Sequence, residues 1–143
     1  MLAGDESAGQ FAGGTVYQAF LSATNYHRWH RPVAGTITAA FVQEGTYYSE
    51  ADSEDADAVE PRYSQSYLAH VAARAVILIE ADNPVIGLTA FVPVGMSEVS
   101  SCMTDPKIQP GYHVAKGEEL GYFQFGGSTH CLIFGQARSP ASP

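Results

Sequence analysis

Two histidines, a serine and the glycines before it are the residues of this 143-residue chain whose types and spacing could do chemistry. His27 and His30 lie three apart in YHRWHRP, so on a helix both imidazoles would project from one face and could share a substrate or a metal ion. Ser128 follows the pair Gly126-Gly127, and paired glycines allow another group to approach the preceding carbonyl closely. The alternatives are a surface turn for the histidine segment and a hairpin turn for GGST.

Metal and nucleotide chemistry have weaker support in the sequence. Two histidines fall short of the three or four ligands of a zinc site. No GK[ST] follows the glycine pair, so the segment is not a nucleotide-binding loop. We therefore expect no bound metal. An acidic cluster lacks the glycine and the terminal bidentate glutamate of a calcium loop and is expected to be a solvated loop; it contains Glu50, Asp52, Glu54, Asp55 and Asp57.

Composition and charge exclude several classes of protein. Seven basic and 15 acidic residues give a net charge of −8, which argues against nucleic acid and against docking on an anionic membrane by charge. With 45% hydrophobic residues the chain is expected to fold as one domain, with Cys102 and Cys131 as buried thiols. Residues 1–14 lack the pattern of a signal peptide, and charges and a proline interrupt the longest apolar stretch, so we predict no transmembrane helix and a cytoplasmic location.

The elements that must position the candidate residues are mostly strands. Alternating apolar residues or β-rich composition predict them, and ADNP at 81–84 reads as a hairpin connection. Possible N-caps at 22–25 predict a short helix over 26–30, which Pro32 ends, and residues 15–21 fit either a strand or a helix. The fold class is mainly β with short helices (α+β), a β-sandwich or a partly closed barrel with hairpins. The expected strands are 36–42, 73–80, 85–92, 98–103, 119–125 and 129–134.

Four stretches of the chain resemble the phosphatidylserine decarboxylase family. They occur in the family's order, and the pairing of the YHRWHRP segment with the KGEELGYFQFGGST segment is specific. The flanking GGTVYQAFLS and the GGSTH segment are similar to the branch that contains fungal tryptophan decarboxylase. The matching stretches are YHRWHRPVAGTI at 26–37, FVPVGMSEVSS at 91–101, VAKGEELGYFQFGGST at 114–129 and HCLIF at 130–134.

The resemblance implies a proenzyme that cuts itself between Gly127 and Ser128 and converts Ser128 to a pyruvoyl group, without pyridoxal phosphate or a metal. The chain would be the C-terminal catalytic part of this proenzyme, with 1–127 as the β-chain part and 128–143 as the short α-chain. The pyruvoyl would form a Schiff base with the substrate amine and release CO2. By the same resemblance, His30 takes the histidine position of an Asp-His-Ser relay, and His27 matches a histidine that transfers a proton to the product carbanion.

The resemblance also sets the expected partners. The substrate carries a free amine and a carboxylate and is either phosphatidylserine, which would yield phosphatidylethanolamine, or an aromatic L-amino acid such as tryptophan. The relay aspartate and membrane-associated helices lie upstream in the family, in a region this chain does not contain; Asp5 matches no family pattern and is not assigned. We expect contacts with that region and with the chain's own cleaved part, a possible homo-oligomer, and membrane contact only through the upstream region.

Two alternatives to a decarboxylase stay open at this point. The V-x-KGEEL turn resembles hairpins of biotinyl and lipoyl carrier domains, although Lys107 and Lys116 lack the sequence context of a modified lysine in such domains. A non-catalytic binding or carrier module is therefore one alternative. The other is an inactive truncated relative, against which the intact GGST and both histidines argue.

Overall fold

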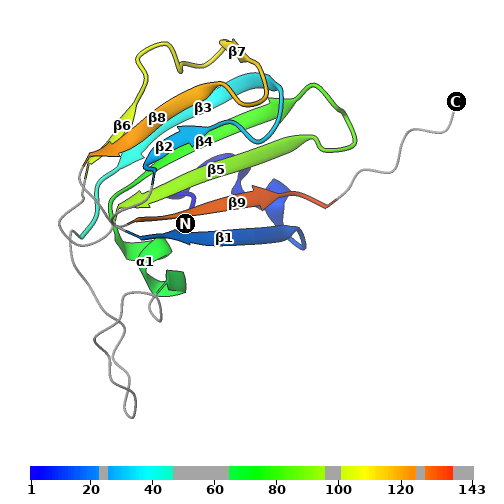
Figure 1. Ribbon diagram of the computed structural model, residues 1–143. Helices are drawn as coiled ribbons and strands as arrows, with labels where there is room; N and C mark the ends of the chain where they lie inside the picture. The colour runs from blue at the N-terminus through cyan, green and yellow to red at the C-terminus, as the bar shows by residue number, and fades with distance from the viewer. Residues whose placement is uncertain (23–25, 47–64, 96–100, 125–127, 137–143) are drawn as a thin grey trace, which may run out of the picture.

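The computed structural model describes residues 1–22, 26–46, 65–95, 101–124 and 128–136, and this part of the chain forms two antiparallel β-sheets, one layered over the other (Figure 1). The larger sheet has the order β1-β9-β5-β4-β3-β7, and the smaller has the order β2-β8-β6. Within the described ranges no helix has the length and hydrophobicity of a membrane-spanning segment. The elements are η1 (a 3₁₀-helix, Glu6–Phe11), β1 (Thr15–Leu21), β2 (Arg28–His30), β3 (Gly35–Gln43), α1 (Gln65–Val71), β4 (Arg74–Ala81), β5 (Leu88–Gly95), β6 (Ser101–Thr104), β7 (His113–Val114), β8 (Glu119–Gln124) and β9 (Ser128–Phe134).

The central strands β4 and β5 of the larger sheet are buried on both faces, which explains their nearly continuous apolar sequence. Along β4, Val76 and Leu78 pack into one hydrophobic cluster, whereas Ile77 and Ile79 pack into another. Successive side chains of a strand point to opposite faces, so the first cluster lies against α1 and the N-terminal segment, and the second lies between the two sheets. Burying one such side chain contributes roughly 1.5–3 kcal/mol, which makes this strand an anchor of the sandwich.

This architecture confirms the expected mainly β fold with short helices in its sandwich form; the two sheets do not close into a barrel. The strand expected over 36–42 is β3, and the expected hairpin is β4–β5. Asn83 fixes the hairpin turn, because its Oδ1 accepts from the Val85 N–H at 3.0 Å and its carbonyl accepts from the Gly87 N–H at 3.2 Å. The remaining expected strands are β6, β8 and β9, and residues 15–21 form strand β1. The acidic cluster of residues 50–57 lies outside the described residues.

The two cysteines are free and buried, as the sequence predicts. Cys131 belongs to the cluster on the α1 side of the large sheet, and Cys102 belongs to the cluster between the sheets. Burial raises the pKa of each thiol to about 11. Both therefore act as small hydrophobic residues of the core, since the reactive thiolate form is suppressed.

The short helix expected over residues 26–30 is wrong, because this segment contains strand β2, which pairs with β8. Trp29 is 3% exposed, and its ring lies edge-on to Phe91 at 6.2 Å and to Phe123 at 4.9 Å between ring centroids. A helix of five residues gains few hydrogen bonds for the backbone that it orders. Burial of the indole between the sheets therefore outweighs the N-capping residues that precede the segment.

The interpretation of GGST as a hairpin turn is also wrong. The strands before and after it, β8 and β9, belong to different sheets, and β9 pairs with β1 on one side and with β5 on the other. Residues 125–127 lie outside the described residues, while Ser128 and Thr129 are the first two residues of β9. Ser128 therefore begins an interior strand of the large sheet.

Candidate active site

The hydroxyl of Ser128 is buried and has no hydrogen-bond partner among the described residues. Ser128 is 0% exposed and pairs with Leu21 of β1 and Gly95 of β5. The next residue, Thr129, is also buried, but its Oγ1 donates to the Ala19 carbonyl at 2.9 Å. An unpartnered buried hydroxyl costs about 1–3 kcal/mol, and such groups call for an explanation such as a catalytic role. The unpartnered hydroxyl makes Ser128 the candidate nucleophile of this site.

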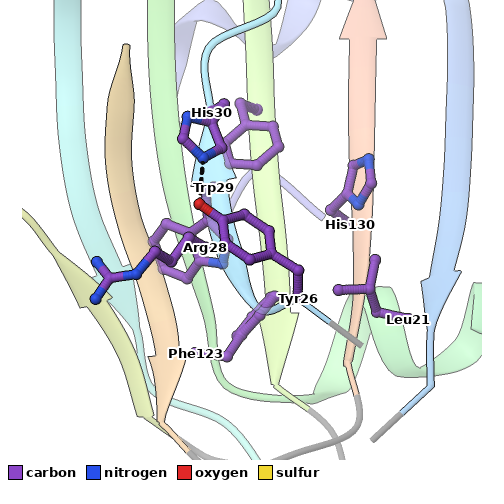
Figure 2. A pocket seen from close by; sticks show the side chains of 8 residues that line it. Leu21, Tyr26, Arg28, Trp29, His30, Phe123 and His130 are labelled. Atoms are coloured by element: carbon purple, nitrogen blue, oxygen red, sulfur yellow. Dashed lines mark hydrogen bonds between the residues drawn. The ribbon is translucent and has the colours of Figure 1, made fainter. Parts of the chain in front are cut away.

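A pocket of about 310 Å³ opens between the two sheets next to the start of β9 (Figure 2). Leu21, the register partner of Ser128, lines this pocket. His130 lines it as well, and because it lies two residues beyond Ser128 on the same strand, the two side chains share one face of the sheet. The pocket thus lies next to the strand that begins at Ser128. Its lining residues are Leu21, Tyr26, Arg28, Trp29, His30, Phe91, Phe123 and His130.

His30 is held in the pocket by a partner on each ring nitrogen. Its Nδ1 lies 2.9 Å from the Gly117 carbonyl oxygen, and its Nε2 lies 2.8 Å from the Tyr26 hydroxyl. The Tyr26 ring also stacks on the imidazole, with 5.7 Å between centroids and 12° between planes. Figure 2 shows the two residues at strand β2, with the hydrogen bond between the Tyr26 hydroxyl and the His30 ring.

These contacts determine which nitrogen of His30 carries the proton. A carbonyl oxygen can only accept, so Nδ1 must donate to Gly117, and in the neutral ring Nε2 then holds the lone pair. The Tyr26 hydroxyl accordingly donates to Nε2. A neutral imidazole with its lone pair on Nε2, here bonded to the Tyr26 hydroxyl, is the form that a general base requires.

His27 lies beside the pocket and not in its lining. Its ring is edge-on to Phe123, with 6.1 Å between centroids, and its backbone carbonyl accepts from the Phe123 N–H at 2.9 Å. Because residues 28–30 are extended, the one-face arrangement expected for His27 and His30 on a helix is wrong. The structure brings His30 and the strand of Ser128 to one pocket, and Phe123 lies between His27 and that pocket.

Sequence reasoning did not identify His130 as a site residue. Its ring lies 5.7 Å from that of Phe91 and 6.4 Å from that of Tyr17, between centroids. Burial lowers the pKa of His130, which favours its neutral form. A signal was present, because position 130 follows Ser128 by two and the segment was expected to be a strand, in which such residues share a face.

The depressed pKa of His130 predicts a pH-dependent loss of stability. Below about 6.5 the unfolded chain binds a proton at this imidazole while the folded protein resists it. The free energy of unfolding should therefore decrease as the pH falls below that value, and decrease less in His130→Gln. Urea unfolding of both proteins across this range measures the difference, and equal slopes would contradict the assignment.

Asp5, the aspartate upstream of the histidine segment, has a structural role at the start of η1. Its carboxylate accepts from the Ser7 backbone N–H at 2.9 Å and from the Ser7 hydroxyl, so it caps η1. These hydrogen bonds to Ser7 lower the pKa of Asp5. The acceptor that the structure places at His30 Nδ1 is the Gly117 carbonyl.

Comparisons with known proteins show which family the chain belongs to. A family model described as phosphatidylserine decarboxylase matches residues 1–142. Decarboxylase iboD of Amanita muscaria is 49% identical over 141 residues, which cover 90% of this chain and 39% of that protein. L-tryptophan decarboxylase of Psilocybe cubensis is 41% identical over 140 residues, covering 92% of this chain and 31% of that protein.

A bacterial relative extends the match beyond fungi. Phosphatidylserine decarboxylase proenzyme of Bacillus thuringiensis is 34% identical over 134 residues, which cover 94% of this chain and 46% of that protein. The chain thus spans less than half the length of each of these three relatives. Because the family model matches nearly every residue, the chain belongs to the phosphatidylserine decarboxylase family.

Proposed function

We propose that this chain is the C-terminal catalytic part of a pyruvoyl-dependent decarboxylase that cuts itself between Gly127 and Ser128. The observation that carries the proposal is the buried Ser128 hydroxyl, without a partner among the described residues, next to a pocket that His30 lines. A buried nucleophile without a partner, next to a pocket that a histidine lines, suits a residue that is consumed in making its own prosthetic group. On this proposal 1–127 is the β-chain part and 128–143 is the short α-chain.

The proposed cleavage uses atoms of the chain and one water. Ser128 Oγ attacks the Gly127 carbonyl carbon, the C–N bond breaks, and the Oγ proton passes through a base to the released nitrogen. The resulting ester then loses the Cα proton of residue 128 and breaks its Cβ–O bond, which leaves a carboxylate on Gly127 and dehydroalanine at 128. Tautomerisation to an imine and hydrolysis by water release ammonia and leave a ketone, the pyruvoyl group.

His30 is the base that we propose for the first step. A serine hydroxyl is a weak nucleophile at its ordinary pKa, so an adjacent acceptor must remove its proton. In the structure the Tyr26 hydroxyl donates a hydrogen bond to the lone pair on His30 Nε2. This hydrogen bond must break before His30 can accept the proton from Ser128. His27 keeps the role that the resemblance implies, proton transfer to the product carbanion, from its place behind Phe123.

The pyruvoyl group would supply an electron sink for loss of the carboxylate. We propose a soluble amino acid with an aromatic side chain as the substrate, because the pocket is lined by Trp29, Phe91 and Phe123 and is 310 Å³ in volume, the size of a small-molecule site. The two fungal decarboxylases also share 49% and 41% identity with the chain, against 34% for the bacterial proenzyme. Decarboxylation of L-tryptophan and of phosphatidylserine in vesicles, measured side by side, tests this choice. The cytoplasmic location and the contacts with an upstream region or a second copy stay predictions.

Intact-mass measurement tests the self-cleavage. The 143-residue chain is expressed alone and together with the part of the Psilocybe cubensis relative that it does not match. The proposal expects two fragments, of which the one that begins at Ser128 has no free α-amine and reacts with hydrazines through its ketone. An uncut chain under both conditions, or a fragment with an ordinary seryl N-terminus, would overturn the proposal.

Replacing His30 with glutamine should slow self-cleavage by about 10²–10⁴-fold, the usual contribution of a positioned general base. Glutamine fills a similar volume but supplies no basic nitrogen. His70 provides the matched control: its Nδ1 donates to the Ser66 carbonyl within α1 at 2.7 Å, and it does not line the pocket. The time course of fragment formation on denaturing gels should be unchanged in His70→Gln. Equal rates in the two variants would exclude His30 as the base.

A further inference from the structure

The Gly117 carbonyl that holds His30 Nδ1 belongs to a turn tied to the end of β2. The turn runs from Ala115 to Glu118 and closes with a hydrogen bond from the Glu118 N–H to the Ala115 carbonyl at 3.1 Å. Gly117 adopts a φ of +83°, a conformation that other L-residues rarely adopt. Arg31, directly after His30, bonds the turn twice: its N–H donates to the Glu118 carbonyl at 3.0 Å, and its carbonyl accepts from the Gly117 N–H at 2.9 Å.

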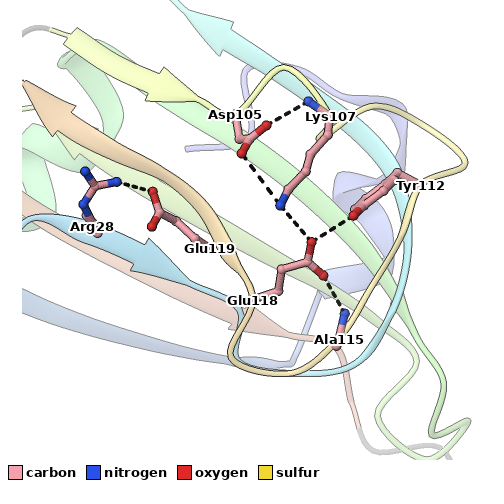
Figure 3. A network of polar contacts seen from close by, with 7 residues as sticks. All are labelled: Arg28, Asp105, Lys107, Tyr112, Ala115, Glu118 and Glu119. Atoms are coloured by element: carbon pink, nitrogen blue, oxygen red, sulfur yellow. Dashed lines mark hydrogen bonds and ion pairs between the residues drawn. The ribbon is translucent and has the colours of Figure 1, made fainter.

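The Glu118 side chain stabilises this turn by accepting hydrogen bonds from residues within and beside it (Figure 3). Its Oε2 accepts from the Ala115 N–H at 3.0 Å, and its Oε1 accepts from the Tyr112 hydroxyl at 2.9 Å and from Lys107 Nζ at 3.0 Å. Asp105 lies on the other side of Lys107, with 3.7 Å between the charged atoms. The hydrogen bond from Ala115 and those from Lys107 and Tyr112 lower the pKa of Glu118 to about 2, so it is ionised at neutral pH.

We propose that Glu118 is a positioning residue for His30: by holding the turn, it keeps the Gly117 carbonyl at Nδ1 and so keeps the lone pair on Nε2. The proposal rests on the proposed function, in which Nε2 takes the Ser128 proton. The Glu118 carboxylate reaches neither the His30 ring nor the pocket lining; it acts through the backbone of the turn. In this chain a backbone carbonyl thereby fixes the tautomer of the base.

Loss of the Gly117 contact would affect the base in two ways. Without an acceptor at Nδ1, the neutral imidazole distributes its proton between the two nitrogens, and the fraction with a lone pair on Nε2 falls. The ring also loses one of the two hydrogen bonds that set its orientation. Both effects reduce the rate of proton removal while leaving the core between the sheets untouched.

Glu119 provides a matched control at the next position in the chain. Its carboxylate pairs with Arg28, and the side chains of Glu118 and Glu119 are 23% and 34% exposed. Arg28 also lies over the Tyr122 ring, 5.4 Å from its centroid. Glu119→Gln therefore changes the net charge of the chain by the same amount as Glu118→Gln. It leaves the side-chain hydrogen bonds of the turn that holds His30 in place.

The test compares Glu118→Ala, Glu118→Gln and Glu119→Gln in the full chain. Self-cleavage should slow by about tenfold or more in Glu118→Ala, a part of the roughly 10²–10⁴-fold that a positioned base contributes. Glu118→Gln should lie between, because its amide oxygen can replace one carboxylate oxygen but its NH₂ cannot accept from Lys107 or Tyr112. Glu119→Gln loses the pairing with Arg28 but keeps the turn, so it should slow cleavage less than Glu118→Gln does.

A second readout separates this proposal from the proposed function. In the Ser128→Ala background, which removes the nucleophile, the ¹⁵N chemical shifts of the His30 ring report the tautomer directly. We expect the Nδ1–H form with Glu118 intact and with Glu119→Gln, and a mixture of the two forms in Glu118→Ala.

Each outcome decides one of the two claims. If the wild-type chain is cut and Glu118→Ala is cut equally fast with an unchanged tautomer, the positioning role is wrong and the proposed function stands. If the wild type is never cut, the proposed function is wrong, and the ring shifts still show whether Glu118 sets the tautomer. If Glu118→Ala fails to fold, the rate and ring shifts of Glu118→Gln relative to Glu119→Gln decide whether Glu118 positions His30.

Discussion

Ser128→Ala should remain a single polypeptide and should be inactive, yet it should be slightly more stable than the uncut parent. Cleavage is impossible because alanine has no hydroxyl to attack the Gly127 carbonyl. Stability should rise by up to about 1 kcal/mol, since an unpartnered buried hydroxyl costs about 1–3 kcal/mol and its removal leaves only a small void. A gain in stability together with a complete loss of function is typical of residues retained for chemistry.

The measurements for this variant need an uncut reference. Urea unfolding of His30→Gln is compared with that of His30→Gln/Ser128→Ala, because His30→Gln is expected to be cut slowly. Thr129→Val serves as the control for a neighbouring hydroxyl: it loses the hydrogen bond to the Ala19 carbonyl, so it should be less stable and still be cut. A destabilised Ser128→Ala would show that the hydroxyl has a structural partner.

Gly121→Ala should unfold the small sheet, with a loss of about 3 kcal/mol or more, at the upper end of overpacking effects. Gly121 lies in β8 between β2 and β6. A Cβ there would lie 2.2 Å from the Met103 carbonyl oxygen and 2.9 Å from two ring carbons of Trp29. Neither the strand backbone nor the indole locked between aromatic rings can move away without displacing β2, which carries His30.

The single tryptophan of the chain makes this effect directly measurable. In Gly121→Ala the Trp29 emission should shift to the red, and self-cleavage should fall with it. Gly111→Ala is the control, because a Cβ there meets nothing within 4 Å and the cost is only the strain of a φ of +90°, about 1–2 kcal/mol. If both variants lost the same stability and the Trp29 emission did not change, close packing would not be the reason that position 121 requires glycine.

Periodicity in the sequence predicted the sandwich because its strands obey simple rules. The runs at 73–80 and 85–92 are apolar on both faces, and Asn83 stands at their turn, so both the burial and the pairing could be inferred locally. The prediction of a helix over 26–30 was wrong for the opposite reason. Its conformation is decided by Trp29 packing against Phe91 and Phe123, contacts that join residues about 60 and 90 positions apart and leave no local pattern.

The sequence predicted the main residues of the candidate site but not the contacts that hold them. Ser128 and His30 came from motifs, and the structure places the strand of one and the ring of the other at a common pocket. Tyr26 and Gly117 could not be assigned as partners of His30, because the first contact requires the non-helical backbone of residues 26–30 and the second requires the pairing of β2 with β8. Long-range pairings of this kind are fixed by tertiary packing and not by spacing.

The position of β9 between β1 and β5 changes how the protein unfolds once it is cut. The new chain end at Ser128 would start a strand that is hydrogen-bonded along both sides, from Ser128 to Phe134, to two strands of the other fragment. Before the cut, unfolding is unimolecular and its midpoint is independent of protein concentration. After the cut, unfolding separates two molecules, so the melting temperature should rise with concentration and dilution should favour dissociation. Maturation would thus convert one polypeptide into a fragment pair whose lifetime depends on how slowly one interior strand leaves its sheet.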